Sequence, residues 1–127
     1  LLLGMGSFWE GADFAQQDKV IEIITRLPFD NPKDPFYQKI ESLFSKQGKS
    51  TFDSYSLPMM VLRFKQAIGR AQRRPEQRSA ILLMDNRPLV KSYGKLFIKE
   101  VSQEVTLRHA PFKQIKEDIQ EFLEKEC

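Results

Sequence analysis

Two short runs of strongly apolar residues place the tightest limit on how this chain folds. The first, at residues 19–27, reads KVIEIITRL, and the second, at residues 80–84, reads AILLM. Both consist largely of β-branched or other aliphatic residues between polar turns, so each is predicted to be a β-strand. Strands that are apolar on both faces are typical of parallel sheets covered by helices. The pattern therefore predicts an α/β fold, with a mostly parallel sheet flanked by helices.

The rest of the chain is predicted to alternate between helices and short connections. Asp34 and Pro35 fit the cap and first turn of one helix, and Pro58 and Pro75 bracket another. The remaining predictions are strands at residues 1–5 and 105–107, loops at 6–14 and 46–56, a helix at 88–101, and a final helix that begins at Pro111. Helical spacing predicts three buried stripes, namely Phe36, Ile40, Leu43 and Phe44; Leu89, Tyr93, Leu96 and Phe97; and Phe112, Ile115, Ile119 and Phe122.

The length and composition of the chain exclude several classes of protein. With 127 residues, the chain is long enough for one domain with a real core. Its one cysteine, Cys127, excludes an internal disulfide and a cysteine-based metal site in this stretch, and points to a reducing, cytoplasmic compartment. No run approaches the length of a membrane span, and the start does not resemble a signal peptide. Because the chain begins without methionine, as a strand already under way, we expect it to be a piece of a longer protein.

Positive charge is concentrated in one segment of the chain. Between Arg63 and Arg78 there are six basic residues and one acidic residue, so this segment carries +5. The whole chain carries only +3, which leaves −2 for the remainder. A local basic patch on a mild background indicates a specific anionic partner rather than general affinity for polyanions.

The segment QAIGRAQR, residues 66–73, gives this patch a geometry. On a helix, Gln66, Arg70 and Arg73 fall on one stripe, and the opposite face carries apolar residues, namely Leu57, Val61, Phe64 and Ile68. Guanidiniums that converge repel each other, so they suit a site for an anion such as a polyphosphate. Gly69 costs about 1 kcal/mol relative to alanine inside a helix, and it leaves room for a ligand or another backbone. The alternative interpretation is a solvated charged face.

The loop GSFWEGADF, residues 6–14, follows a predicted strand, which is where α/β proteins place their ligands. Ser7 and neighbouring backbone amides suit a phosphate, Trp9 suits stacking on a base, and Asp13 can accept a hydrogen bond from a ribose hydroxyl. The alternative is a tight turn whose aromatic residues lie in the core.

Taken together, GSFWEGADF and QAIGRAQR closely resemble motifs V and VI of superfamily 2 helicases, and most of all those of the DinG/XPD branch. In that branch a Gly-Ser-x-x-Glu-Gly-x-Asp-Phe loop precedes a Gln-x-x-Gly-Arg-x-x-Arg helix. The intervening RLPFDNPKDPF resembles the Leu-Pro-Phe segment of bacterial DinG proteins, and DNRPLVKSYGKLF resembles the stretch after motif VI. The resemblance covers most of residues 1–101.

The resemblance implies that residues 1–127 are the C-terminal portion of a second RecA-like motor domain. Such a domain has three layers and is of the P-loop NTPase type, and it would belong to an ATP-dependent DNA helicase of DNA repair. Arg70 and Arg73 match the arginine fingers that reach the ATP γ-phosphate, and Gln66 matches the residue that senses this phosphate or orients the attacking water. The further implied positions are Glu10, Gly11, Asp13 and Gly69 at the nucleotide, and Ser7 and Trp9 at the DNA.

The partners that the resemblance implies are single-stranded DNA and the N-terminal motor domain of the same protein, with no membrane. Gln77 and Ser79 depart from the family, which often has Asp and Gly there. The chain also contains no Gly-x-x-x-x-Gly-Lys-Ser/Thr loop. We therefore expect ATP and Mg²⁺ to be bound mainly by the upstream motor domain, and this chain alone to be inactive.

Two other functions stay open. The chain could be a motor-like regulatory or DNA-binding region of a DinG-like 3′-5′ exonuclease, or a non-catalytic nucleic-acid-binding module. Among the remaining residues, Asp85 and Arg87 follow a strand and are expected to pair structurally. His109 is expected to be a bystander, because spacing suggests no catalytic partner for it.

Overall fold

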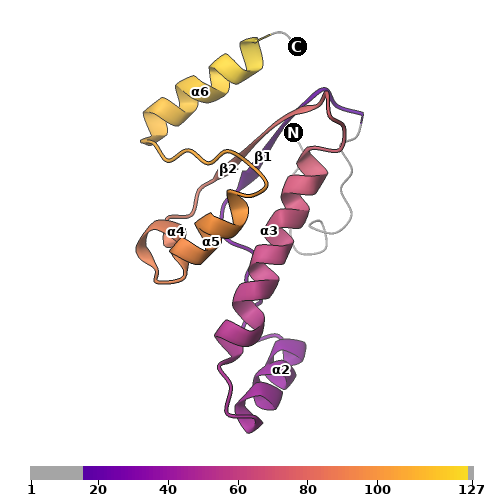
Figure 1. Cartoon of the computed structure of the whole chain (residues 1–127), viewed down its shortest axis with the longest axis vertical. Coiled ribbons are helices and arrows are strands. Elements are labelled where there is room, and N and C mark those ends of the chain that lie inside the picture. Colours follow the sequence, from indigo (N-terminus) through magenta and orange to yellow (C-terminus); the bar gives the residue numbers. More distant parts are fainter. Residues whose placement is uncertain (1–15, 126–127) are drawn as a thin grey trace.

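The structure is a computed structural model, and it describes residues 16–125 (Figure 1). Its elements, in chain order, are the strand β1 (Lys19–Ile24), the helix α2 (Pro35–Lys46), a π-helical turn η1 (Phe52–Ser56), the helix α3 (Leu57–Ala71), the strand β2 (Arg78–Leu83), and the helices α4 (Arg87–Val90), α5 (Gly94–Val101) and α6 (Phe112–Glu124). The strand predicted at residues 1–5 and the loop predicted at 6–14 lie outside the described residues.

In the described part of the chain, β1 and β2 form a two-stranded parallel sheet. The register places Lys19 opposite Arg78 and Ile24 opposite Leu83. Parallel neighbours require a long crossover, and here the crossover carries α2 and α3. The prediction of an α/β fold with a parallel sheet is therefore confirmed. β1 ends before residue 27 because the backbone N–H of Leu27 bonds to the Asp85 side chain (2.9 Å).

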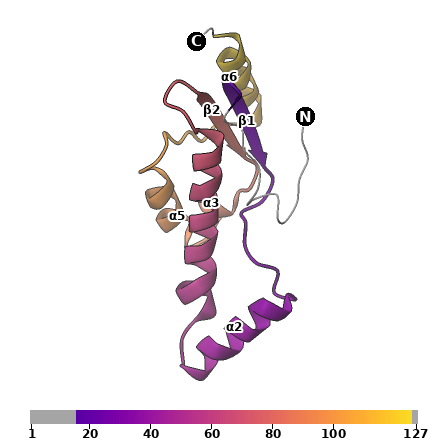
Figure 2. The same cartoon turned by 90° about the vertical axis from the view of Figure 1, so that its right-hand side faces the viewer.

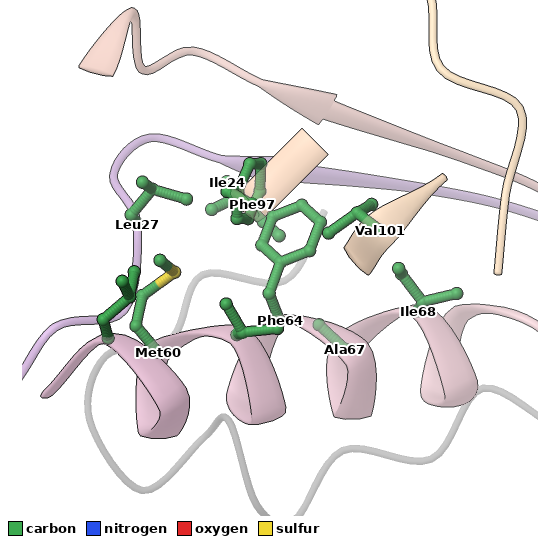
Figure 3. Close-up of a cluster of buried hydrophobic side chains, with 10 residues drawn as sticks. Ile24, Leu27, Met60, Phe64, Ala67, Ile68, Phe97 and Val101 are labelled. Atoms are coloured by element: carbon green, nitrogen blue, oxygen red, sulfur yellow. The ribbon is translucent and has the colours of Figure 1, made fainter. Parts of the chain in front are cut away.

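The helix α3 lies along the sheet and supplies most of the core (Figure 2). Its predicted apolar face is confirmed, since Leu57, Val61, Phe64 and Ile68 are 4–8% exposed. This face packs against Ile24 and Leu27 on one side and against Phe97 and Val101 of α5 on the other (Figure 3). The rings of Phe64 and Phe97 meet edge to face, with centroids 5.0 Å apart. The core therefore fixes how α3 sits on β1 and α5.

Three predictions of helices and loops were wrong in their extent. The helix α3 ends at Ala71, because the ring of Pro75 would clash with a helical carbonyl four residues before it. The helix predicted at 88–101 is two helices, α4 and α5. A Cβ on Gly94 would lie 1.8 Å from the carbonyl oxygen of Pro88, so only glycine allows their close approach. The loop predicted at 46–56 contains η1, which leads directly into α3.

The helices α2 and α6 form where the sequence predicts them, but neither has a fully buried residue. The Asp34 cap on α2 is confirmed, because its Oδ1 accepts the backbone N–H of Phe36 (2.8 Å). The apolar stripes were predicted to be buried, yet several of their members are 45–65% exposed, namely Phe36, Leu43, Leu89, Leu96 and Phe112. The two helices lie at opposite ends of the molecule, away from the core (Figure 1). Helical spacing predicted the positions of these two helices correctly, but it did not predict whether another element covers their apolar faces.

The C-terminal part of the chain differs from the prediction in one respect. Residues 105–107 do not form the predicted strand, although Val105 packs against the core. The helix α6 is held through its last carbonyls, because Lys19 Nζ donates to the carbonyl oxygens of Leu123 (2.8 Å) and Lys125 (2.6 Å). Among residues 16–125, no helix is both long enough and apolar enough to span a membrane.

Candidate functional site

An open depression of about 370 Å³ lies beside the C-terminal half of α3. The described residues that line it are Gln66, Gly69, Arg70 and Arg73. These four are the positions that the sequence predicted from the segment QAIGRAQR. The structure therefore brings together the four site residues of this segment.

The helix α3 presents these residues because its opposite face is fixed in the core. Ala67 is fully buried and Ile68 is 8% exposed, whereas Gln66 and Gly69 are exposed. Apart from its chain neighbours and the backbone of its own helix, no described atom lies within 4 Å of the place where a Cβ on Gly69 would sit. The glycine thus leaves part of the depression free of a side chain, at a cost of about 1 kcal/mol relative to alanine.

Arg73 reaches the depression from beyond the end of α3, not from within it. The Gln77 side chain, which is 2% exposed, accepts the backbone N–H of Arg73 at its Oε1 (2.7 Å). Its Nε2 donates to the carbonyl oxygen of Gln17 (2.8 Å). Gln77 therefore ties the turn that carries Arg73 to the segment before β1. The sequence identified Gln77 only as a departure from a motif, because its role depends on a residue distant in the chain.

Arg70 differs from most of the other basic residues of segment 63–78. Arg63 pairs with Asp30 (2.8 Å), Lys65 with Glu100 (3.1 Å) and Arg74 with Asp18 (3.0 Å). Arg78 donates to the carbonyl oxygen of Lys125 (2.9 Å). Within residues 16–125, no hydrogen bond or ion pair holds the guanidinium of Arg70. Several basic residues of segment 63–78 therefore have structural partners, whereas Arg70 lines the open depression.

Glu22 on β1 is an acidic residue on which the charge of Arg70 acts. Burial raises the pKa of Glu22, and the positive charge of Arg70 opposes this by a smaller amount. Its Oε2 atom is buried and has no hydrogen-bond partner in the described part of the chain. The sequence analysis missed Glu22, and the signal that could have found it is an acidic residue inside the apolar run KVIEII.

The expected pair of Asp85 and Arg87 is confirmed, and it lies at the ends of the two strands. Arg87 Nε donates to Asp85 Oδ2 (2.8 Å), which also accepts the backbone N–H of Leu27. Burial acts to raise the pKa of Asp85, but the hydrogen bonds from Arg87 and Leu27 outweigh it and lower this pKa to about 2. His109 is exposed between α5 and α6.

The other predicted site residues, Ser7, Trp9, Glu10, Gly11 and Asp13, lie outside the described residues. From residue 16 to residue 125, no three His, Cys, Asp or Glu side chains gather in a way that would hold a metal ion. What this part of the site offers is two guanidiniums and a carboxamide around an open space. Guanidiniums donate hydrogen bonds in a planar fork that matches phosphate oxygens, so these residues fit the phosphate end of a nucleotide.

Comparison with known proteins connects this geometry to one family. Residues 1–104 match the model of the family described as "Helicase C-terminal domain". The "3'-5' exonuclease DinG" of Bacillus subtilis (strain 168) is 40% identical over 98 residues, which are 77% of this chain and 10% of that protein. The "ATP-dependent DNA helicase YoaA" of Escherichia coli (strain K12) is 35% identical over 98 residues, which are 77% of this chain and 15% of that protein.

A longer match extends into α6. The "3'-5' exonuclease DinG" of Staphylococcus aureus (strain NCTC 8325 / PS 47) is 36% identical over 122 residues, or 96% of this chain and 12% of that protein. The chain thus spans 10–15% of the length of these three curated relatives. No solved structure matches it.

Proposed function

Because the chain belongs to the family of helicase C-terminal domains, and is a C-terminal region of the DinG type, we propose that it supplies half of the ATPase and translocation motor of a DinG-like ATP-dependent DNA helicase. The observation that supports this most directly is the convergence of Gln66, Gly69, Arg70 and Arg73 on one open depression. The described residues form one wall of this open depression, which agrees with a site completed by a second domain.

In this proposal Arg70 and Arg73 act as arginine fingers, and Gln66 senses the terminal phosphate or orients the attacking water. Phosphoryl transfer spreads negative charge over the oxygens of the transferred group, and guanidiniums placed nearby stabilise that charge. Since the fingers come from one domain and the phosphate loop from another, hydrolysis is coupled to closure of the two domains. ATP supplies the phosphoryl group, and we assign its main binding, with Mg²⁺, to the upstream motor domain.

The proposal also covers predicted site residues that lie outside the described structure, and the partners that they would contact. Glu10, Gly11 and Asp13 would lie on the nucleotide side, and Ser7 and Trp9 would contact single-stranded DNA. A cytoplasmic role in DNA repair belongs to the same proposal. The chain by itself is expected to turn over no ATP, because it lacks the phosphate loop.

The test is Arg70→Ala in the full-length protein. ATP turnover should fall by about 10³-fold, which is the size of effect that an arginine finger can have. Folding should survive, because the Arg70 guanidinium has no hydrogen bond in the described structure and Arg70 projects away from the core face of α3. Arg70→Lys should not restore turnover, because lysine lacks the planar fork. Affinity for single-stranded DNA without nucleotide should change little.

The matched control is Arg74→Ala, because Arg74 lies in the same segment and forms an exposed ion pair with Asp18. Exposed pairs contribute little to stability, so this variant should keep near-normal turnover. Normal ATP hydrolysis by Arg70→Ala would contradict the proposal. If hydrolysis stays intact while DNA binding weakens with a smaller salt dependence, the arginines contact backbone phosphates, as in a non-catalytic binding module.

A second function is favoured by the names of two of the relatives, "3'-5' exonuclease DinG". In that case the chain is a motor-like region that supports DNA binding and regulation in a DinG-like exonuclease. Nucleotide dependence separates the two functions in the full-length protein. A helicase unwinds a duplex only with ATP, whereas an exonuclease shortens a labelled strand from its 3′ end without ATP.

A further inference from the structure

Gln77 is a polar residue that the fold buries almost completely, at 2% exposure, immediately before β2. Burying a carboxamide is costly unless its oxygen and its nitrogen both find hydrogen-bond partners. Here both do, because Oε1 accepts the backbone N–H of Arg73 (2.7 Å) and Nε2 donates to the carbonyl oxygen of Gln17 (2.8 Å). These partners are 4 and 60 residues away along the chain, so this one side chain joins two separate segments.

The turn between α3 and β2 is held in place around this side chain. The helix ends before Arg73, so the helix itself does not set the course of the backbone there. The backbone N–H of Gln77 donates to the carbonyl oxygen of Arg74 (3.1 Å) and closes the turn. The next backbone N–H, that of Arg78, donates to the carbonyl oxygen of Asp18 (2.9 Å). The turn therefore lies against the start of β1, and the Gln77 carboxamide is the side-chain link between them.

Glutamine suits this position because one carboxamide both accepts and donates hydrogen bonds. An ionised carboxylate of similar size could accept the Arg73 N–H but could not donate to the carbonyl oxygen of Gln17. Methionine has a similar length and could replace neither bond effectively. The two substitutions therefore separate the two bonds of the bridge.

We propose that Gln77 is the positioning residue of Arg73: its carboxamide fixes the backbone from which the Arg73 side chain reaches the depression that Gln66, Gly69 and Arg70 also line. Arg70 needs no such support, because it lies within α3. Fixing the backbone at Arg73 before an anion arrives lowers the ordering cost of binding and keeps the guanidinium in a productive place. This role rests in part on the proposed function, because it assumes that Arg73 meets a phosphate.

The first experiment measures hydrogen exchange of single backbone amides in the 127-residue chain by NMR. The Met84 amide, which bonds to the carbonyl oxygen of Ile24 (2.8 Å), reports opening of the fold and is the internal reference. In Gln77→Met, the Arg73 amide should exchange about tenfold faster relative to this reference, because it has lost its acceptor. Equal acceleration of both amides, or unchanged exchange at Arg73, would overturn the positioning role.

Inorganic pyrophosphate separates this inference from the proposed function. In the wild type, pyrophosphate should shift the ¹⁵N–¹H signals of both Arg70 Nε and Arg73 Nε. In Gln77→Met, the shift at Arg70 should remain and the shift at Arg73 should shrink. If pyrophosphate moves neither signal in the wild type while exchange at Arg73 depends on Gln77, the phosphate site is wrong and the anchoring by Gln77 stands. If both signals move alike in the wild type and in Gln77→Met, the phosphate site stands and the role of Gln77 is wrong.

The second experiment measures turnover in the full-length protein. Gln77→Met should lower kcat about tenfold or more with little change in KM for ATP, because misplacement of a reacting group costs rate rather than binding. Gln77→Glu should lose a similar factor at about pH 8 and regain part of it toward about pH 6. Burial raises the pKa of the new carboxyl group, and its protonated form can again donate to the carbonyl oxygen of Gln17.

The control for turnover is Gln72→Met, which makes the same substitution at an exposed residue beside Arg73 and should leave kcat unchanged. A merely structural role for Gln77 would not give Gln77→Glu a pH dependence different from that of the wild type. An unaltered kcat in Gln77→Met, or a pH profile of Gln77→Glu parallel to that of the wild type, would contradict the positioning role.

Discussion

Gly69 lies in the last turn of α3, on its exposed side. Beyond its chain neighbours and its own helix backbone, a Cβ there would meet no described atom within 4 Å. Alanine therefore fits the helix without strain and should raise the free energy of unfolding by about 0.5–1 kcal/mol. The added methyl group would project into the depression, so pyrophosphate should bind more weakly. Urea denaturation and a pyrophosphate titration of Gly69→Ala measure the two effects.

The control for this prediction is Gly48→Ala, which makes the same substitution at a backbone φ of 66°. Alanine is strained in that conformation, so stability should fall, while pyrophosphate binding should not change. Suppose that Gly69→Ala raises stability and leaves pyrophosphate affinity at the wild-type value. The anion then does not lie against this part of α3.

Single residues also show where sequence reasoning stops. Gln66, Gly69 and Arg70 could be placed together because helical spacing is local. Arg73 lines the same depression, although the helix that was expected to carry it ends earlier. Gln77 could not be assigned, because it bonds to Gln17, which only the folded chain brings near. A polar residue inside or beside an apolar strand is the one local signal of such a role.

At the scale of elements, Asp85 joins the ends of the two strands. It follows β2 and accepts the backbone N–H of Leu27, which follows β1, while Arg87 pairs with it. Its pKa is about 2 in the folded chain, against 3.8 ordinarily, so the unfolded chain binds protons more readily as the pH falls. The contribution of Asp85 to stability is therefore complete above about pH 4 and is lost as the pH falls toward about 2.

Asp85→Asn should lower the free energy of unfolding at pH 7 by about 1–2 kcal/mol and flatten its fall between pH 4 and pH 2. Urea denaturation at pH 7 and pH 3 measures both effects. Asp53→Asn, at an exposed residue of η1, is the control and should change neither. Equal stability of Asp85→Asn and wild type at pH 7 would show that this carboxylate does not hold the strand ends together.

The positions of helices and strands could be predicted where the sequence pattern that produces them involves only neighbouring residues. The parallel pair of strands followed from two apolar runs, and α2 followed from the Asp34 cap and its spacing. The burial of α2 and α6 was not predictable, because an apolar stripe shows that a helix has a face to cover and not what covers it. The turn η1 was missed because its residues read as a polar loop, although Tyr55 packs between Tyr37 and Phe44.

At the scale of the whole molecule, the described structure consists of a core unit with α6 attached to it. The ten residues of the core cluster all lie between Ile24 and Val101. The helix α6 contributes none of them, and the family match ends at residue 104, before α6 begins. Its contacts with the rest of the chain include the hydrogen bonds from Lys19 and Arg78 and the packing of the Arg78 guanidinium over the Phe122 ring (4.9 Å).

Ending the chain after residue 107 should therefore lower the free energy of unfolding by only about 1 kcal/mol, since exposed hydrogen bonds contribute little individually. Urea unfolding should remain a single cooperative transition, and pyrophosphate binding at the depression should persist. Phe64→Ala in the full chain is the comparison, because removing a core ring should cost about 3–5 kcal/mol. Loss of the cooperative transition in the shortened chain would mean that α6 is an integral part of the fold. Retention of both the transition and the pyrophosphate response would place the folding unit and the anion site together within residues 1–107.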